Sequence, residues 1–167
     1  PLAVASGVTA AADRGIVVTT PALFEDGASM DTVVFDKTGT LSDGAMRVLD
    51  VRTNETSPET VRRLAGAVEA LSSHPIATAI AESDDAAFDE VTDFTTHDRG
   101  VTGTVDGDAI AVGHPDFVAG RGHDVPETLS AAIDAARDRG SVPVAVGWGG
   151  HVRGVIEVGD RPRPGWE

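Results

Sequence analysis

Apolar positions along this chain follow two different periodicities, and each predicts its own kind of element. Thr32–Phe35 is a continuous run of mostly β-branched and aromatic residues, typical of a strand buried on both faces of a parallel sheet. Helical spacing follows Ser57-Pro58, where a serine cap and a proline at the first helical position predict a helix start. Two further helices are predicted, over Pro75–Ala81 and over Asp124–Arg139.

Extended runs joined by glycine-containing turns predict antiparallel hairpins. One pair of runs flanks Asp106-Gly107-Asp108, and another is joined by Gly149-Gly150. The strands are expected around Val48–Val51 and over Val101–Val105, Ala109–Val112, Val142–Trp148 and Val152–Val158. The predicted fold class is therefore α/β. Part of a Rossmann-like domain, containing the buried strand, receives an inserted α+β domain of antiparallel strands and helices.

The start of the chain leaves two readings open. Pro1–Ala12 is apolar and rich in small residues, but it is shorter than the roughly 18 apolar residues that mark a membrane span. It is either the tail of a membrane helix or an ordinary short helix. Ile16–Val18 is expected to be extended, and Pro21–Met30 to be a linker or short helix.

Composition excludes several classes of function. Cysteine is absent, so disulfides and thiolate metal sites are excluded for these residues. The formal charge of −14 makes nucleic acid an unsuitable partner, because phosphate contacts need a basic face. An acidic, lysine-poor surface suits a salty cytoplasm, which we state as a hypothesis about habitat. Equal thermal stability in low and molar KCl, measured by circular dichroism, would contradict it.

The string Asp36-Lys37-Thr38-Gly39-Thr40 carries the predicted chemistry. A carboxylate at the end of a strand is suited to attack the γ-phosphorus of ATP and form an acyl phosphate. Lys37, the only lysine in the chain, places positive charge beside that nucleophile. Oxygen ligands such as Asp36 suit the Mg²⁺ that accompanies ATP, and Thr38 offers a hydroxyl.

This string, followed by Leu41, resembles the phosphorylation motif of P-type ATPases within the wider haloacid dehalogenase-like fold. The resemblance implies that Asp36, Lys37 and Thr38 are catalytic, and that Asp36 and Thr38 lie at the Mg²⁺ site. Soluble phosphatases of that fold usually have a second aspartate two residues after the nucleophile, as general acid and base. Here that position is Thr38, so a persistent acyl phosphate is expected, as a pump requires.

The middle of the chain resembles the nucleotide-binding domain of the heavy-metal-transporting branch. Ser73-His74-Pro75 matches its Ser/Glu-His-Pro stretch, and Glu69 stands five residues before the histidine. The resemblance implies that His74 packs against adenine and that Glu69 helps to bind it. Without the motif upstream, a histidine before proline is more often a helix-capping or surface residue.

Two glycines extend this resemblance, each beside a departure from it. Gly100 fits the second glycine of the family's Gly-x-Gly turn, but Asp98 replaces the first and adds bulk and negative charge. Gly113 fits the Val-Gly-Asn segment, with His114 in place of asparagine. Alternatively, the glycines serve only a strand-entry turn and a hairpin end.

The predicted organisation has four parts. They are residues 1–28 as membrane-helix exit and linker, 29–42 as the start of the phosphorylation domain, 43–154 as the nucleotide-binding domain, and 155–167 as the return into the phosphorylation domain. The resemblance implies a cytoplasmic fragment of a membrane protein that uses ATP and Mg²⁺. Its partners would be a heavy-metal cation, reached through a membrane domain outside this chain, and the rest of the same ATPase.

Two other functions remain open from the sequence. A soluble haloacid dehalogenase-like phosphohydrolase would use Asp36 as nucleophile, and robust phosphatase activity on a generic phosphate ester would support it. A non-catalytic nucleotide-binding or interaction module would retain Asp36 as a relic. An Asp36→Asn variant with unchanged activity would show that this aspartate is not the nucleophile.

Overall fold

The computed structural model describes residues 2–20, 22, 24, 27, 30–36, 40–83 and 89–162, with the side chains at positions 43, 161 and 162 left aside. The chain divides into two compact units, Pro1–Asp36 and Lys37–Glu167, which are treated separately below. Among the described residues, no helix is long and apolar enough to cross a bilayer.

The first unit contains one helix and an extended segment. Helix α1 (Leu2–Ala12) has no buried residue, and the Phe24 ring lies against it at Gly7. Both readings of this segment, a membrane-helix tail and an ordinary short helix, stay open. Residues 16–18 form neither helix nor strand. Most of the expected linker at 21–30 lies outside the described residues.

The predicted buried strand at Thr32–Phe35 is wrong for this structure. Residues 31–36 have no regular secondary structure, and the side chains of Val33, Val34 and Phe35 are 66%, 90% and 63% exposed. A parallel strand is stable only between neighbouring strands that satisfy its backbone groups and cover its faces. Every pairing between the named strands is antiparallel and lies within the second unit, so the segment has no such neighbours among the described residues.

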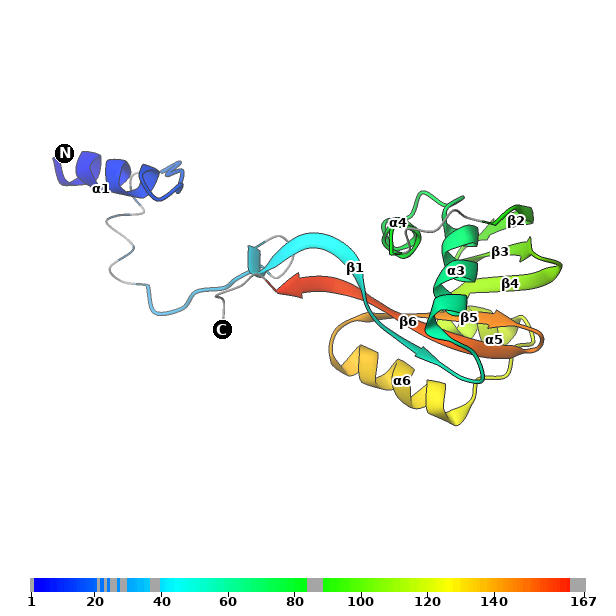
Figure 1. The fold of residues 1–167 in the computed structure, drawn as a ribbon. Helices are drawn as coiled ribbons and strands as arrows, with labels where there is room; N and C mark the ends of the chain where they lie inside the picture. Colours follow the sequence, from blue (N-terminus) through cyan, green and yellow to red (C-terminus); the bar gives the residue numbers. More distant parts are fainter. Residues whose placement is uncertain are drawn as a thin grey trace. The chain divides into compact units, whose positions relative to one another are not determined.

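The second unit is built on a six-stranded antiparallel sheet (Figure 1). Its spatial order is β1-β6-β5-β4-β3-β2. The strands are β1 (Ser42–Thr53), β2 (Val91–His97), β3 (Gly100–Val105), β4 (Asp108–Gly113), β5 (Val142–Trp148) and β6 (His151–Pro162). The predicted antiparallel sheet is confirmed, and both predicted hairpin turns use positive φ angles, at Asp106 and Gly107 and at Gly149 and Gly150.

Two pairs of helices cover the two faces of this sheet (Figure 1). On one face lie α3 (Pro58–Glu69) and α4 (Pro75–Ala81), and on the other lie α5 (Pro115–Gly120) and α6 (Glu127–Asp138). The side chains of Val61, Leu64, Val68 and Ile80 form one core with β3–β6, and those of Val118, Leu129 and Ile133 form another with β4–β6. Each sheet face is thus closed by apolar helix residues.

The helix starts follow the capping signals in the sequence. Ser57 caps α3 by accepting a hydrogen bond from the backbone N–H of Thr60 at 3.1 Å, as the Ser-Pro start predicts. Helix α4 has the predicted bounds, whereas α6 begins at Glu127, three residues later than expected. The sequence analysis missed β2, which is interrupted by a register shift with a positive φ at Asp93, and the short helix α5.

Candidate functional site

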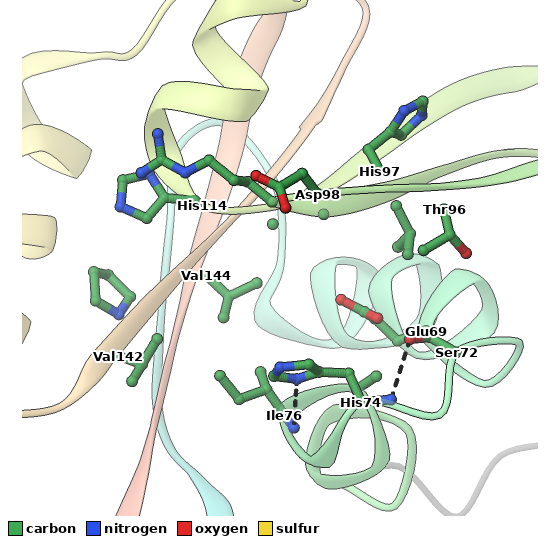
Figure 2. Close-up of a pocket in the computed structure, with 16 residues that line it drawn as sticks. Glu69, Ser72, His74, Ile76, Thr96, His97, Asp98, His114, Val142 and Val144 are labelled. Carbon is green, nitrogen blue, oxygen red and sulfur yellow. Dashed lines mark hydrogen bonds between the residues drawn. The ribbon is translucent and has the colours of Figure 1, made fainter.

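A pocket of about 310 Å³ opens beside the α3–α4 connection (Figure 2). One wall, the helical side, comes from the end of α3, the α3–α4 connection and the first turn of α4, and its residues are Glu69, Ser72, His74, Ile76 and Ala77. The opposite wall, the turn side, comes from the β2–β3 turn (residues 98–100) and the end of β4 (Gly113 and His114). The remaining lining residues are Thr96 and His97 of β2, Val101 of β3 and the first residues of β5, Val142–Val144.

All four predicted nucleotide-binding residues line this one pocket. Glu69 and His74 lie on the helical side, and Gly100 and Gly113 lie on the turn side. They come from the end of α3, the cap of α4, the start of β3 and the end of β4. These positions are up to 44 residues apart in sequence (113 − 69), and the fold brings them together.

The predicted catalytic residues are placed differently. Asp36 is exposed at the end of the first unit, and so not buried in a core. Lys37 and Thr38 lie outside the described residues, so their predicted roles stay predictions.

Glu69 is a buried acid that faces the pocket. The residue is 6% exposed, and burial raises the pKa of its carboxyl to about 7. No hydrogen bond or ion pair offsets this burial within the described part of the chain. The carboxylate therefore gains most from a ligand that brings its own N–H or O–H donor.

His74 caps α4 as well as lining the pocket. Its Nδ1 accepts a hydrogen bond from the backbone N–H of Ile76 at 3.2 Å, and Pro75 occupies the first helical turn (Figure 2). Because Nδ1 is the acceptor, the neutral ring carries its proton on Nε2. His74 can therefore have both of its expected roles. Nδ1 caps the helix, as expected of an isolated His-Pro pair, and the ring face and Nε2–H remain available for the ligand that the resemblance implies.

His114 repeats this arrangement on the turn side. Its Nδ1 accepts from the backbone N–H of Asp116 at 3.2 Å, and it caps α5 ahead of Pro115. Burial, together with the nearby Arg99 charge, lowers the pKa of His114, so the ring is neutral near pH 7. From the sequence, His114 was identified only as a replacement for asparagine. The signal for its capping role was the second His-Pro pair, His114-Pro115.

Gly100 and Gly113 are paired across β3 and β4 where the two strands come unusually close. A Cβ on Gly100 would lie 2.4 Å from the carbonyl oxygen of Val112. A Cβ on Gly113 would lie 2.4 Å from the carbonyl oxygen of Arg99, and its φ of +153° is rare for other residues. Both glycines are thus required by close backbone approach, which also leaves backbone open at the pocket surface.

Charged and aromatic side chains surround the turn side. Arg99 Nη2 lies 3.5 Å from Asp116 Oδ2, and the Arg121 guanidinium stacks over Phe117 at 4.9 Å from the ring centroid. The His97 ring of β2 lies 5.3 Å from the Phe117 ring of α5, and its Nδ1 is 3.0 Å from Arg121 Nη2. Asp98 is exposed in the turn and also lines the pocket, opposite the helical side (Figure 2).

A magnesium site is not formed by the described residues alone. Of the two predicted oxygen ligands only Asp36 is described, and no group of three or more acidic or histidine side chains in the described ranges could hold a metal ion. Octahedral Mg²⁺ is usually held by one or two carboxylates together with waters and substrate phosphates.

Comparison with known proteins places this architecture in a family. A family model described as "Hydrolase: haloacid dehalogenase-like hydrolase" matches residues 30–167, which include the whole of the sheet unit and its pocket. The chain belongs to the haloacid dehalogenase-like hydrolase family. The match begins just before Asp36, as the resemblance of the phosphorylation motif predicts.

Curated relatives of this haloacid dehalogenase-like chain are P-type ATPases. The chain is 39% identical over 165 residues to a probable copper-exporting P-type ATPase V of Mycobacterium tuberculosis, covering 96% of this chain and 21% of the relative. It is 33% identical over 168 residues to copper-exporting P-type ATPase B of Archaeoglobus fulgidus, covering 98% and 24%. The chain thus spans about a fifth to a quarter of the length of these relatives.

Solved structures similar to this chain also come from P-type ATPases. The chain matches a zinc-transporting PIB-type ATPase with a TM-score of 0.80 at 28% identity, covering 96% of this chain and 26% of that one. It also matches the catalytic domain of the CPx-ATPase CopB-B, described with conformational changes upon nucleotide binding, with a TM-score of 0.62 at 28% identity and coverage of 89% and 51%. The resemblance to P-type ATPases of the heavy-metal branch is confirmed.

Proposed function

We propose that this chain is the part of an ATP-driven heavy-metal cation transporter that binds ATP and carries the aspartate phosphorylated during hydrolysis. The observation that carries the proposal is the pocket. Glu69, His74, Gly100 and Gly113 line it from four separate elements. Relatives that share most of this chain's length are named copper-exporting P-type ATPases, which supports the transporter context.

The pocket chemistry suits a purine nucleotide. A purine amino group can donate a hydrogen bond to the Glu69 carboxylate, and the His74 ring can stack on the purine and donate through Nε2. The apolar side chains of Ile76 and Val144 also line the pocket and can pack on the ring faces.

The proposed reaction takes place at Asp36. One carboxylate oxygen attacks the γ-phosphorus of ATP, the bond from that phosphorus to the bridging oxygen of ADP breaks, and an aspartyl phosphate and ADP result. Lys37 would offset charge beside the nucleophile, and Asp36 and Thr38 would contribute oxygen ligands for the Mg²⁺ that accompanies ATP. Hydrolysis of the aspartyl phosphate would drive transport of a heavy-metal cation through the membrane part of the intact protein, with these residues on its cytoplasmic side.

The predicted domain boundaries at residues 28, 42 and 154 belong to this proposal. Residues 43–154 would be the nucleotide-binding domain, and 29–42 and 155–167 would belong to the phosphorylation domain.

Isothermal titration of ATP into the chain in molar KCl tests the binding half of the proposal. We expect binding to wild type and at least tenfold weaker binding to His74→Ala, because the variant loses both the stacking surface and the Nε2–H donor. His151→Ala is the matched control, since this exposed histidine does not line the pocket. No heat at millimolar ATP would overturn the proposal.

A phosphorylation assay on the intact ATPase tests the chemical half. The radiolabel of γ-³²P-ATP should be retained by wild type and lost in Asp36→Asn. Retention of the label by the variant would remove Asp36 as the phosphorylated residue.

A further inference from the structure

The pocket has one side chain with a permanent positive charge, and it lies on the turn side. Among the lining residues, Arg99 is the only arginine or lysine, and its side chain is 49% exposed. The buried acid Glu69 lies on the opposite, helical side (Figure 2). A ligand that fills the pocket therefore meets a hydrogen-bond acceptor at one end and a guanidinium at the other.

The backbone of Arg99 is fixed by the close approach of β3 and β4. The Arg99 carbonyl accepts a hydrogen bond from the His114 N–H at 2.9 Å. The same carbonyl lies where a Cβ on Gly113 would have to go, at 2.4 Å. The Gly100–Gly113 pair thus allows the β2–β3 turn to contact the end of β4 closely. This contact fixes the backbone position of Arg99.

The side chain of Arg99 also has an ion-pair partner. Its Nη2 lies 3.5 Å from Asp116 Oδ2, and the Asp116 backbone N–H is in turn bound by His114 Nδ1. His114, the cap of α5, therefore contacts the carbonyl of Arg99, and Asp116 in the first turn of α5 contacts its guanidinium. A guanidinium paired in this way can donate to phosphate oxygens with less loss of side-chain freedom than an unrestrained arginine.

We propose that Arg99 is a specificity-determining residue that contacts the anionic tail of the nucleotide, so that the pocket prefers nucleoside di- and triphosphates to nucleosides. The inference rests on the proposed function, because it takes the base to lie against Glu69 and His74. From that side, the tail extends toward the only cationic side chain in the lining. Asp98, the neighbouring acid in the same turn, opposes this attraction.

Titration of ATP and of adenosine into the 167-residue chain at fixed KCl tests the inference. Arg99→Gln should weaken ATP binding about tenfold, because a charge-assisted hydrogen bond at a partly exposed site is lost, and should change adenosine binding by less than about twofold. Arg52→Gln is the matched control: it removes an exposed, ion-paired arginine from β1, outside the pocket, and should leave both affinities unchanged. Asp98→Asn should strengthen ATP binding by about two- to threefold without affecting adenosine.

The outcomes separate this inference from the proposed function. Wild-type chain that binds neither ligand overturns the proposed function, and with it this inference. Wild-type chain that binds ATP, with an ATP-to-adenosine affinity ratio that Arg99→Gln leaves unchanged, overturns the role of Arg99 alone. Weaker ATP binding by Asp98→Asn would likewise contradict an anionic tail on the turn side.

Discussion

Two regions meet at the end of α3, and they use burial in opposite ways. Val68 faces the sheet, is fully buried and belongs to the apolar core under α3 and α4. Glu69, the next residue, is almost as buried but faces the pocket without a compensating partner among the described residues. Burial of an apolar side chain stabilises the fold, whereas burial of an unpaired carboxylate costs free energy. The pocket wall thus includes a buried group that lowers stability, which is characteristic of a binding site.

The largest effect should come from the core side. Ile80→Ala removes a fully buried side chain of α4, and we expect the free energy of unfolding to fall by about 2–5 kcal/mol. Leu71→Ala is the matched control, since it removes an isomeric side chain that is 53% exposed, and should change stability by less than about 0.5 kcal/mol. Urea denaturation in constant KCl measures both. Equal losses of unfolding free energy in the two variants would contradict the distinction between the buried core position Ile80 and the surface position Leu71.

The next largest effect should come from Glu69 on the pocket side, where a substitution should raise the free energy of unfolding. Because burial raises the pKa of Glu69 from 4.5 to about 7, the folded state holds this proton more tightly than the unfolded state. The contribution of Glu69 to stability is therefore present in full below about pH 4.5 and is lost as pH rises through about 7. The shift corresponds to about 3 kcal/mol.

Glu69→Gln removes this titration and should be more stable than wild type by about 1–3 kcal/mol at pH 8, with the gain disappearing near pH 4.5. Denaturation curves of both proteins at several pH values measure the difference. Glu82→Gln, which replaces an exposed acid at the end of α4, should show no such pH-dependent gain. A Glu69→Gln variant that is less stable than wild type at pH 8 would mean that the carboxylate has a partner and does not oppose folding.

A smaller loss is expected where the pocket wall is made of backbone. Gly113→Ala places a Cβ against the Arg99 carbonyl and forces an unfavourable φ, so the free energy of unfolding should fall by about 2 kcal/mol. Gly120→Ala is the control at the end of α5, because nothing lies within 4 Å of the added Cβ. Thermal denaturation followed by circular dichroism compares them, and equal stability of Gly113→Ala and wild type would show that the strands can separate at little cost.

Much of this arrangement could be predicted from local sequence signals. The cap and proline at Ser57-Pro58 specify the start of α3, and Gly149-Gly150 specifies a tight turn between β5 and β6, because both depend on neighbouring residues alone. Glu69 and His74 were found by resemblance to a family. The His74 cap also depends on adjacent residues alone, and capping was one of its expected roles. The burial of Glu69 could not be predicted, since it depends on how α3 and α4 pack on the sheet.

The failures have a common physical cause. Val33-Val34-Phe35 has the composition of a buried strand, but strand formation depends on neighbouring strands that a local pattern does not reveal. The place of Arg99 in the pocket could not be predicted from its neighbours in sequence, because it depends on the register that pairs Gly100 with Gly113. Strand β2 was missed because the positive φ at Asp93 interrupts its alternation.

The two His-Pro caps have a consequence for the entropy of recognition. In each imidazole Nδ1 accepts a hydrogen bond from the first turn of a helix. The ring plane and the tautomer are therefore set before any ligand binds. Freezing a mobile side chain on binding typically costs about 0.5–1.5 kcal/mol, and a preorganised ring avoids much of that cost. Substitution of Pro75 or Pro115 is therefore expected to weaken the affinity for the nucleotide, even though a proline ring offers no polar group to the ligand.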